Sequence, residues 1–487
     1  RASGGNPLFL IELARAGGGT TPTGRPLAAL IHDRLRMLDE ASRDLLGWAA
    51  AIGGEFGVDR LAAAVALPVT EVLSRIGQFE RHGLMRATGE GNFDFVHDLV
   101  RQTVYRDLST PRRRALHRQI AQAFAVASAE DPWLHGAVVH HASRAGDVHL
   151  ATRAALAAGD HWLRVFAYVE AAQVAEHALL LLEQITHGAD RARLEIGLLR
   201  LRVAAASAPG SRRMPELAAR IRQAADTAQS LALHAEASSG WEILAYWHQR
   251  QGDAVAAQAA TMAAERCARL ADAMTQCQQL ANTGRCLIDI EADGLRGRAL
   301  LADAASLADE LQIPLMELEW GRGLAARDDG DLETAHACLE RSVALARAAL
   351  NHWREYECML ALATVEYELG RFGDVLRHVH DVADAAKRMG ELQVPFADAL
   401  GALARQRLGA AEAAVEISAS VAALRERDAK AHLSYVLNEL AVRALQTGAI
   451  GEATRLANEA LEAASAVRRP SQIARARATL SAAAPAA

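Results

Sequence analysis

Features that mark membrane, disulfide-linked and nucleic-acid-binding proteins are scarce in this sequence. The 487 residues include five cysteines, an odd number with none in a Cys-X-X-Cys pair, which argues against a disulfide or zinc framework. No apolar run approaches the length that spans a bilayer, and the first residues lack the pattern of a signal peptide. A formal net charge of −6 supplies no global basic field. We therefore expect a cytoplasmic protein with free, buried thiols and no membrane contact.

Motifs for catalysis and phosphate binding are missing as well. No Gly-X4-Gly-Lys-Ser/Thr loop occurs, and the only lysines are Lys387 and Lys430. Without a loop that cradles phosphates and its lysine, the chain by itself is not an efficient ATPase. Paired carboxylates in a Gly-rich pocket and a nucleophile elbow are also missing. We therefore expect no enzyme, no catalytic residue and no cofactor bound by this chain alone.

Helix-forming residues are what the sequence has in abundance. Alanine and leucine dominate, arginine and glutamate are interspersed, and only 12 prolines interrupt them. Hydrophobic residues make up 51% and charged residues 23%, a globular composition in a chain long enough for two or three domains. The composition predicts an all-α protein.

Short Gly/Asp turns recur between long helical stretches in the C-terminal three quarters. Their separations are 42, 36, 40, 39 and 39 residues, and they fall at Gly252, Gly294, Gly330, Gly370, Gly409 and Gly448. One turn and two helices per unit is the pattern of a helix-pair solenoid. This region resembles tetratricopeptide repeats, although its period is nearer 39 than 34 residues. We predict seven or eight pairs from about Trp133 onward, in a right-handed superhelix that occupies residues 129–487.

Residues 26–128 lack this repeat. Helical patterns are followed by two short alternating segments, LMRAT and FDFVH, which a Gly-rich turn joins. This pattern predicts a β-hairpin, and helices with such a hairpin make a winged-helix module. The expected recognition helix, TEVLSRIGQFERHG, carries mixed charge instead of the basic or amide-rich edge that reads DNA. Direct DNA binding by this chain is therefore not expected.

Two short motifs flank this module. In SGGNPLFLIEL, Asn6 can cap a helix and Pro7 fits its first position. In FDFVHDLVRQTVY, His97 ends the second hairpin strand and Arg101 lies one turn into the next helix. With the repeats, these motifs resemble the signal-transduction ATPases with numerous domains, a class that includes LuxR-type and AfsR-type regulators and cyclase-linked ATPases.

The resemblance implies a P-loop ATPase module, of which residues 1–25 are the C-terminal remnant, then the winged helix and the repeats. Gly5 and Pro7 match a GxP motif whose proline packs on adenine, and His97 matches a histidine that reaches the β-phosphate of ADP. ATP or ADP would then bind in the full-length parent, with its upstream ATPase domain. The alternatives are that Pro7 only starts a helix and that His97 is a hydrogen-bonded core residue.

Two further clusters have plainer interpretations. The basic residues 112–114 are expected on a solvated helix face or at an interdomain contact. His135, His140, His141 and His149 are dense, but they lack the carboxylate and histidine spacing of a known metal site. We therefore expect no metal.

Aromatic residues, only 5% of the chain, gather in helices that lead into three of the turns, and arginines accompany them. Aromatic and arginine side chains are the favoured anchors of recognition surfaces. We predict a groove for a peptide or a small anionic ligand, lined by Trp247, Arg250, Trp320, Arg322, Trp353, Tyr356 and Tyr367. The alternative is that these rings fill space between repeats.

Taken together, these features predict the sensory and protein-interaction region of a bacterial signalling ATPase, a transcriptional regulator. Binding of a protein or small effector on the repeats would be coupled to the nucleotide state. The alternative is a stand-alone tetratricopeptide-like scaffold that binds other proteins without nucleotide. Whether the effector domain binds DNA or is a cyclase stays open.

Overall fold

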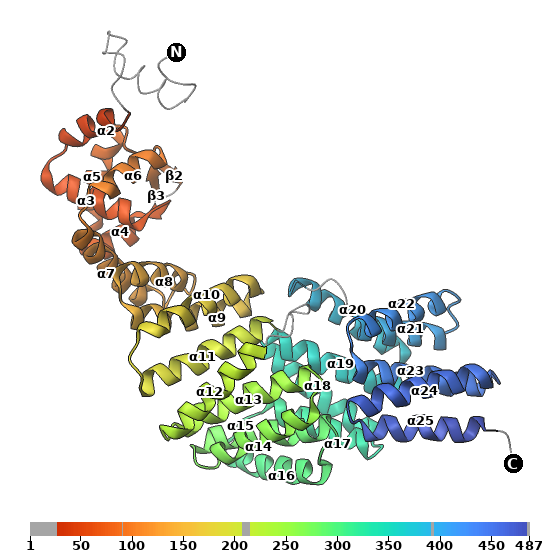
Figure 1. Cartoon of the computed structure of the whole chain (residues 1–487). Coiled ribbons are helices and arrows are strands. Elements are labelled where there is room, and N and C mark those ends of the chain that lie inside the picture. The colour runs from red at the N-terminus through yellow and green to blue at the C-terminus, as the bar shows by residue number, and fades with distance from the viewer. Residues whose placement is uncertain (1–26, 90, 207–214, 391–393, 485–487) are drawn as a thin grey trace. The chain divides into compact units, whose positions relative to one another are not determined.

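The computed structural model describes residues 27–89, 91–206, 215–390 and 394–484 (Figure 1). The chain divides into two compact units, Arg1–Ala158 and Gly159–Ala487, and each is described by itself. Gly5 and Pro7, with the predicted ATPase remnant, lie outside the described residues.

The first unit combines helices with a small sheet. Its elements are α2 (Leu27–Arg36), α3 (Glu40–Ile52), β1 (Phe56–Gly57), α4 (Val58–Val65), α5 (Val69–Arg81), β2 (Met85–Gly89), β3 (Asn92–Phe95), α6 (Asp98–Asp107), α7 (Thr110–Ala127) and α8 (Leu134–Ala145). The strands are antiparallel in the order β1-β3-β2. The predicted hairpin is thus present as β2 and β3. Strand β1 was not predicted, because two residues are too few to show an alternating pattern.

One face of this sheet is buried against the helices. Phe93 and Phe95, two residues apart on β3, both point into the core, as the alternation of a strand requires. Leu46, Leu61 and Phe79, from α3, α4 and α5, are fully buried in this unit as well. Apolar burial of this kind is the main stabilising contribution to such a module.

The second unit consists of helices in the part of the chain that the structure describes. They are α9 (Val148–Arg164, which begins before the division), α10 (Tyr168–Leu181), the short 3-10 helix η1 (Leu182–Gln184), α11 (Ala189–Ala206), α12 (Pro215–Ser230), α13 (His234–Arg250), α14 (Ala254–Ala268), α15 (Ala273–Asp289), α16 (Gly294–Leu311), α17 (Met316–Asp328), α18 (Leu332–Ala348), α19 (His352–Glu368), α20 (Phe372–Arg388), α21 (Pro395–Arg407), α22 (Ala413–Glu426), α23 (Lys430–Gln446), α24 (Ile450–Ala466) and α25 (Pro470–Ala483). The six predicted turns each join two packed helices, from α13–α14 to α23–α24.

The turn at Gly330 shows how the sequence makes a pair. Gly330 has φ 79°, a left-handed conformation that glycine adopts without steric cost, and it ends α17. Asp331 then caps α18, because its side chain accepts a hydrogen bond from the Thr334 backbone N–H at 3.1 Å. A Gly-Asp pair therefore stops one helix and starts the next.

A second class of turn joins one pair to the next and was invisible in the sequence. At these turns residues other than glycine take the left-handed conformation, for example Gln312, Leu350 and Asp428 with φ between 52° and 55°. Eighteen helices, α8 to α25, follow Trp133 among the described residues. With α13–α14 to α23–α24 as pairs, the same frame gives eight pairs from α9 to α24, flanked by α8 and α25, which agrees with the expected seven or eight.

The first helices of successive pairs line the inside of the second unit. Helices α15 and α17 contact each other, as do α23 and α25. Across the interior, Tyr246 of α13 contacts Trp353 of α19, and Tyr435 of α23 contacts Glu368 of α19. The superhelix therefore winds tightly enough to bring together helices that are far apart in the sequence.

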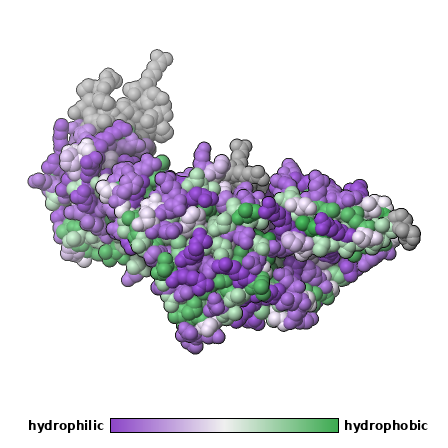
Figure 2. Space-filling model, turned by 60° about the horizontal axis from the view of Figure 1, so that its bottom comes forward, coloured by the Kyte–Doolittle hydropathy of each residue, from purple (hydrophilic) through white to green (hydrophobic). Residues whose placement is uncertain are grey.

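Among the residues that the structure describes, no helix is both long enough and apolar enough to cross a bilayer. Figure 2 shows hydrophilic and apolar residues interspersed on the face in view. Singly exposed apolar side chains, such as Leu295, are normal on a protein surface.

Candidate functional site

A cluster of aromatic rings and guanidinium groups, which we call the interior cluster, connects α13 with α19. At its centre, the Tyr246 hydroxyl accepts a hydrogen bond from Trp353 Nε1 and donates one to Glu357 Oε1 at 3.3 Å. The Arg354 guanidinium lies 4.8 Å from the centroid of the Tyr246 ring, and Arg250 lies 4.4 Å from that of Trp353. Cation–π contacts of this kind contribute on the order of 0.5–2 kcal/mol each. The cluster therefore ties two helices together across the interior.

The structure brings four of the seven predicted groove residues to this cluster. Trp353 stacks on Tyr356 with ring centroids 5.2 Å apart, and Arg250 covers Trp353. Trp320 joins them because Arg354 lies 5.7 Å from its ring centroid. Both Trp320 and Trp353 are buried. These two rings therefore pack against other side chains, and little of their surface is open to solvent on the inner side of the superhelix.

The other three predicted residues make different contacts. Trp247 is buried in the core. Arg322 is exposed and donates to Glu319 on its own helix at 2.9 Å. Tyr367 packs edge-on against Phe372, and burial raises the pKa of its phenol to about 12. The positions of these three residues in the sequence did not show which face of each helix points toward the inside of the superhelix.

Sequence reasoning missed the polar residues on α15 that face the same space. Arg285 is 3% exposed and lies 4.5 Å from the centroid of the Trp320 ring. Asn282 donates to Glu242 of α13 at 2.9 Å, and burial raises the pKa of the Glu242 carboxyl. Asn282, Arg285 and Asp289 follow one another at intervals of three and four residues. That spacing places them on one face of a helix and was a signal available in the sequence.

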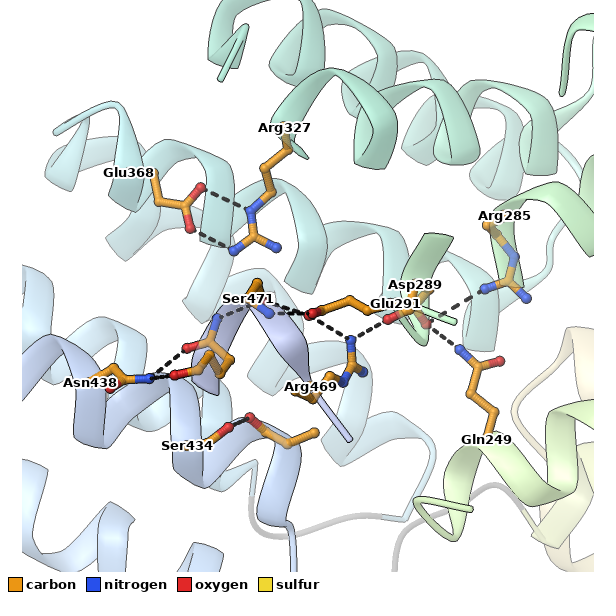
Figure 3. Close-up of polar contacts among 12 residues, drawn as sticks. Gln249, Arg285, Asp289, Glu291, Arg327, Glu368, Ser434, Asn438, Arg469 and Ser471 are labelled. Atoms are coloured by element: carbon orange, nitrogen blue, oxygen red, sulfur yellow. Dashed lines mark hydrogen bonds and ion pairs between the residues drawn. The ribbon is translucent and has the colours of Figure 1, made fainter. Parts of the chain in front are cut away.

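A second polar group, which we call the latch, joins the end of α15 to the start of α25 (Figure 3). The Glu291 carboxylate accepts hydrogen bonds from both the backbone N–H and the hydroxyl of Ser471, each at 2.7 Å. Arg469 donates to the backbone carbonyl of Asp289, and its guanidinium lies 3.6 Å from Glu291. These contacts connect segments 180 residues apart, so the latch closes the superhelix on itself.

A bidentate ion pair holds the next stretch of the interior, also drawn in Figure 3. Arg327 of α17 donates to both carboxylate oxygens of Glu368 on α19, at 2.9 and 2.6 Å. The Tyr435 hydroxyl of α23 donates to the same carboxylate at 3.2 Å. Bidentate pairs of this kind fix geometry as well as charge.

In the first unit, His97 caps helix α6. Its Nδ1 accepts a hydrogen bond from the Leu99 backbone N–H at 3.2 Å, and the side chain is exposed. Next to it, hydrogen bonds from Arg101 and Gln102 lower the pKa of the Asp98 carboxyl. His97 therefore lies on the surface of this unit and not in its core.

The predicted basic and histidine clusters take part in internal contacts. Arg112 pairs with Asp44, and Arg113 donates to the backbone carbonyl of Tyr105 at 2.9 Å. His141 bonds to His117 through their Nδ1 atoms, 2.8 Å apart. Among the described residues, no group of three or more histidine, cysteine, aspartate or glutamate side chains is arranged to hold a metal ion.

Comparison with known proteins shows what this arrangement is similar to. No family model matches the chain. An uncharacterized protein of Rhizobium meliloti (strain 1021) is 30% identical over 214 residues, which cover 38% of this chain and 20% of that protein. The chain thus spans about a fifth of the length of this relative.

Solved structures are similar over more of the chain. A signal transduction ATPase with numerous domains and a tetratricopeptide repeat sensor, from Pyrococcus horikoshii, matches with a TM-score of 0.56 and 12% identity, over 99% of this chain and 68% of that chain. A Rap protein complexed with competence and sporulation factor matches with a TM-score of 0.45 and 13% identity, over 68% and 97%. At such identities the first likeness establishes the fold alone, an all-α solenoid of tetratricopeptide-like helix pairs.

Proposed function

We propose that this chain is the sensory and partner-binding region of a cytoplasmic bacterial signalling ATPase. The observation that carries the proposal is the interior cluster, in which arginine and aromatic side chains from α13, α15, α17 and α19 converge on one space. Arginine and aromatic side chains are the common anchors of binding sites, and the inner surface of a solenoid is its usual binding surface. The tetratricopeptide repeat sensor named for the Pyrococcus horikoshii protein supports the same role here.

In this proposal the first unit is a winged helix that transmits the state of the repeats to an upstream ATPase domain. Its helices and three-stranded sheet have the order that such a module requires. His97, exposed at the start of α6, is the residue that contacts bound ADP in the parent protein. The output is regulation of transcription, and the chain itself is neither an enzyme nor a direct DNA-binding protein.

The proposal is tested by partner capture from a lysate of the source bacterium. We expect the wild-type chain to retain a protein or small effector and Arg250→Ala to lose it, because Arg250 is exposed at the interior cluster. Arg322→Ala is the matched control, since Arg322 is an exposed arginine that pairs with Glu319 instead. Equal capture by all three chains, with equal melting temperatures, would refute binding at the interior cluster.

The stand-alone scaffold makes a different prediction. If the repeats act without nucleotide, addition of the captured partner leaves ADP release from the full-length parent unchanged. If they act as a sensor, the partner accelerates ADP release, and Arg250→Ala removes that effect. Measuring ADP release with and without partner therefore separates the two functions.

A further inference from the structure

The contacts that close the superhelix differ in kind from those that build it. Along the solenoid, neighbouring helices bury apolar side chains against one another, and α25 packs mainly on α23 and α24. The latch instead joins the start of α25 to the distant end of α15 through polar groups (Figure 3). Ser471 is exposed, Glu291 is 19% exposed and Arg469 is 24% exposed. The closure therefore depends on a few hydrogen bonds that water can reach.

One small apolar contact lies beside these hydrogen bonds. The Cβ atom of a residue at Gly252, in the turn between α13 and α14, would lie 3.3 Å from Val467 Cγ1, in the turn between α24 and α25. Two turns touch at this point, across a glycine. This contact is far smaller than the interface between two packed helices, so it adds little that would hold the closure.

The latch lies next to the exposed part of the interior cluster. Asp289 accepts a hydrogen bond from Gln249, the residue before Arg250, and its backbone carbonyl accepts one from Arg469. His432 of α23 is exposed, yet burial by the surrounding protein and the positive charges of Arg469 and Arg250 lower the pKa of its imidazole to about 4. Arg250 and His432 therefore face one space that solvent reaches and protein largely encloses.

We propose that the latch is a gate to this space. While it is closed, small molecules reach Arg250 and His432, but a chain or a larger partner does not. When the hydrogen bonds of Glu291 and Arg469 break, α24 and α25 move away from the ends of α13 and α15, and the interior cluster becomes accessible. The inference rests on the proposed function and names the regulation of its binding surface.

The first test measures access with thiol reagents of two sizes. All five native cysteines are buried, so His432→Cys supplies the reactive thiol in the full chain. We expect Ser471→Ala and Glu291→Gln each to speed its reaction with a maleimide on a long polyethylene glycol chain by about tenfold, because each weakens a hydrogen bond to a charged group. The reaction with N-ethylmaleimide should not change.

Glu459→Gln is the matched control for the latch variants. It weakens the ion pair between Arg425 and Glu459, which is also partly exposed and joins α22 to α24 away from the latch. Both reaction rates should match those of the chain that carries His432→Cys alone. A control that reacts as fast as the latch variants would refute the gate, because any weakened ion pair would then have the same effect.

A disulfide across the two turns should hold the gate closed. The 3.3 Å between the Gly252 Cβ position and Val467 Cγ1 suits a disulfide formed by Gly252→Cys with Val467→Cys. In a chain that also carries His432→Cys and Ser471→Ala, oxidation of this pair should restore the slow reaction with the long reagent. Reduction should return the fast reaction, and the reduced chain is the reference for any strain at Gly252.

The second test measures the opening itself. Spin labels at Leu295→Cys and Ala474→Cys lie at exposed positions of α16 and α25. We expect a second distance population, longer by about 10 Å, one helix diameter, at about 1 M salt, where charges are screened beyond about 3 Å. Labels at Asn458→Cys and Ala474→Cys, both in the C-terminal helices, should keep one distance.

Two results would overturn the gate. One is a reaction with the long reagent that is equally fast with and without the latch variants, and the other is a single distance between α16 and α25 at every salt concentration. If partner capture depends on Arg250 while neither measurement responds to the latch, the proposed function stands and the gate is refuted. If the latch opens while capture does not depend on Arg250, the gate is confirmed and the proposed binding surface is refuted.

Discussion

At the scale of single residues, the two buried histidines of the first unit show how local environment sets proton affinity. Tyr105 hydroxyl, His117 and His141 form a chain of hydrogen bonds, each 2.8 Å long, that links α6, α7 and α8. Burial, with smaller contributions from His140 and Arg144, lowers the pKa of His117 to about 4 and that of His141 to about 3. Both imidazoles are therefore neutral in the folded protein at neutral pH.

The free energy of unfolding of the region that holds these histidines should fall as the pH falls. In the unfolded chain both histidines titrate near 6.5, so between that value and pH 3–4 the unfolded state binds more protons and is favoured. Each pKa unit corresponds to about 1.4 kcal/mol, so we expect the loss from pH 7 to pH 5 to reach roughly 2 kcal/mol for each histidine and roughly 4 kcal/mol for the two. Hydrogen exchange of α7 and α8 amides at the two pH values, corrected for intrinsic rates, measures it. His141→Gln, which cannot titrate, should reduce the loss, and equal protection at both pH values would contradict the prediction.

His97 allows a second prediction at this scale. If His97 contacts bound ADP as we propose, His97→Ala in a protein that includes the ATPase domain should raise basal output and speed ADP release, because a polar or charge-assisted hydrogen bond to phosphate, worth roughly 1.5–3 kcal/mol, would be lost. His380→Ala is the control, since His380 is exposed on α20 and contacts Asp384 on the same helix. Reporter output and ADP retention that match the wild type in both variants would show that His97 only caps α6.

At the scale of elements, the crossing of α15 and α16 depends on two glycines that face each other. A Cβ atom on Gly284 would lie 2.8 Å from the Gly297 carbonyl oxygen, and one on Gly297 would lie 2.9 Å from that of Gly284. Backbone atoms cannot yield as a flexible side chain can. The two helices therefore approach as closely as they do because neither residue has a side chain.

Gly284→Ala should consequently destabilise the second unit by about 1–3 kcal/mol, the usual cost of overpacking. Gly294→Ala is the matched control, because Gly294 begins α16 with nothing within 4 Å of its Cβ position. Urea unfolding of the two variants measures the difference. Equal midpoints would show that the crossing adjusts without cost.

The latch is a helix cap supplied from a distant element. The Glu291 carboxylate accepts the Ser471 backbone N–H in the first turn of α25, where a negative charge also interacts favourably with the helix dipole. We expect Glu291→Ala to cost about 0.5–2 kcal/mol and to increase hydrogen exchange mainly in α25. Gln312→Ala changes another left-handed position and should leave α25 unaffected. Unchanged exchange in α25 of the Glu291 variant would mean that the cap adds nothing to docking.

At the scale of the whole molecule, the sequence has no phosphate-binding loop and only two lysines. We predict that the chain alone releases no more phosphate from ATP than a protein-free blank. The measurement is a continuous phosphate assay with the purified chain. Release above the blank that is abolished by a substitution within residues 1–126 would overturn the prediction.

The sequence by itself determined the elements of this protein. Glycine turns about 39 residues apart, followed by capping aspartates such as Asp331, set where helices end and begin, because these residues act on their own backbone. The alternating segments around Gly89 set the hairpin in the same way. The turns in which Gln312 or Leu350 takes the left-handed conformation were not predicted. Neither residue type favours that conformation, so the packing of the neighbouring helix pairs imposes it.

Only the tertiary structure decided which inward faces meet. Four predicted groove residues came together and three did not, and Arg285 meets the ring of Trp320, from the next pair, only in the folded solenoid. The physical reason is that a small rotation between neighbouring pairs accumulates along a solenoid. The accumulated rotation brings Tyr246 next to Trp353 and Glu291 next to Ser471. No local pattern in the sequence predicts these contacts.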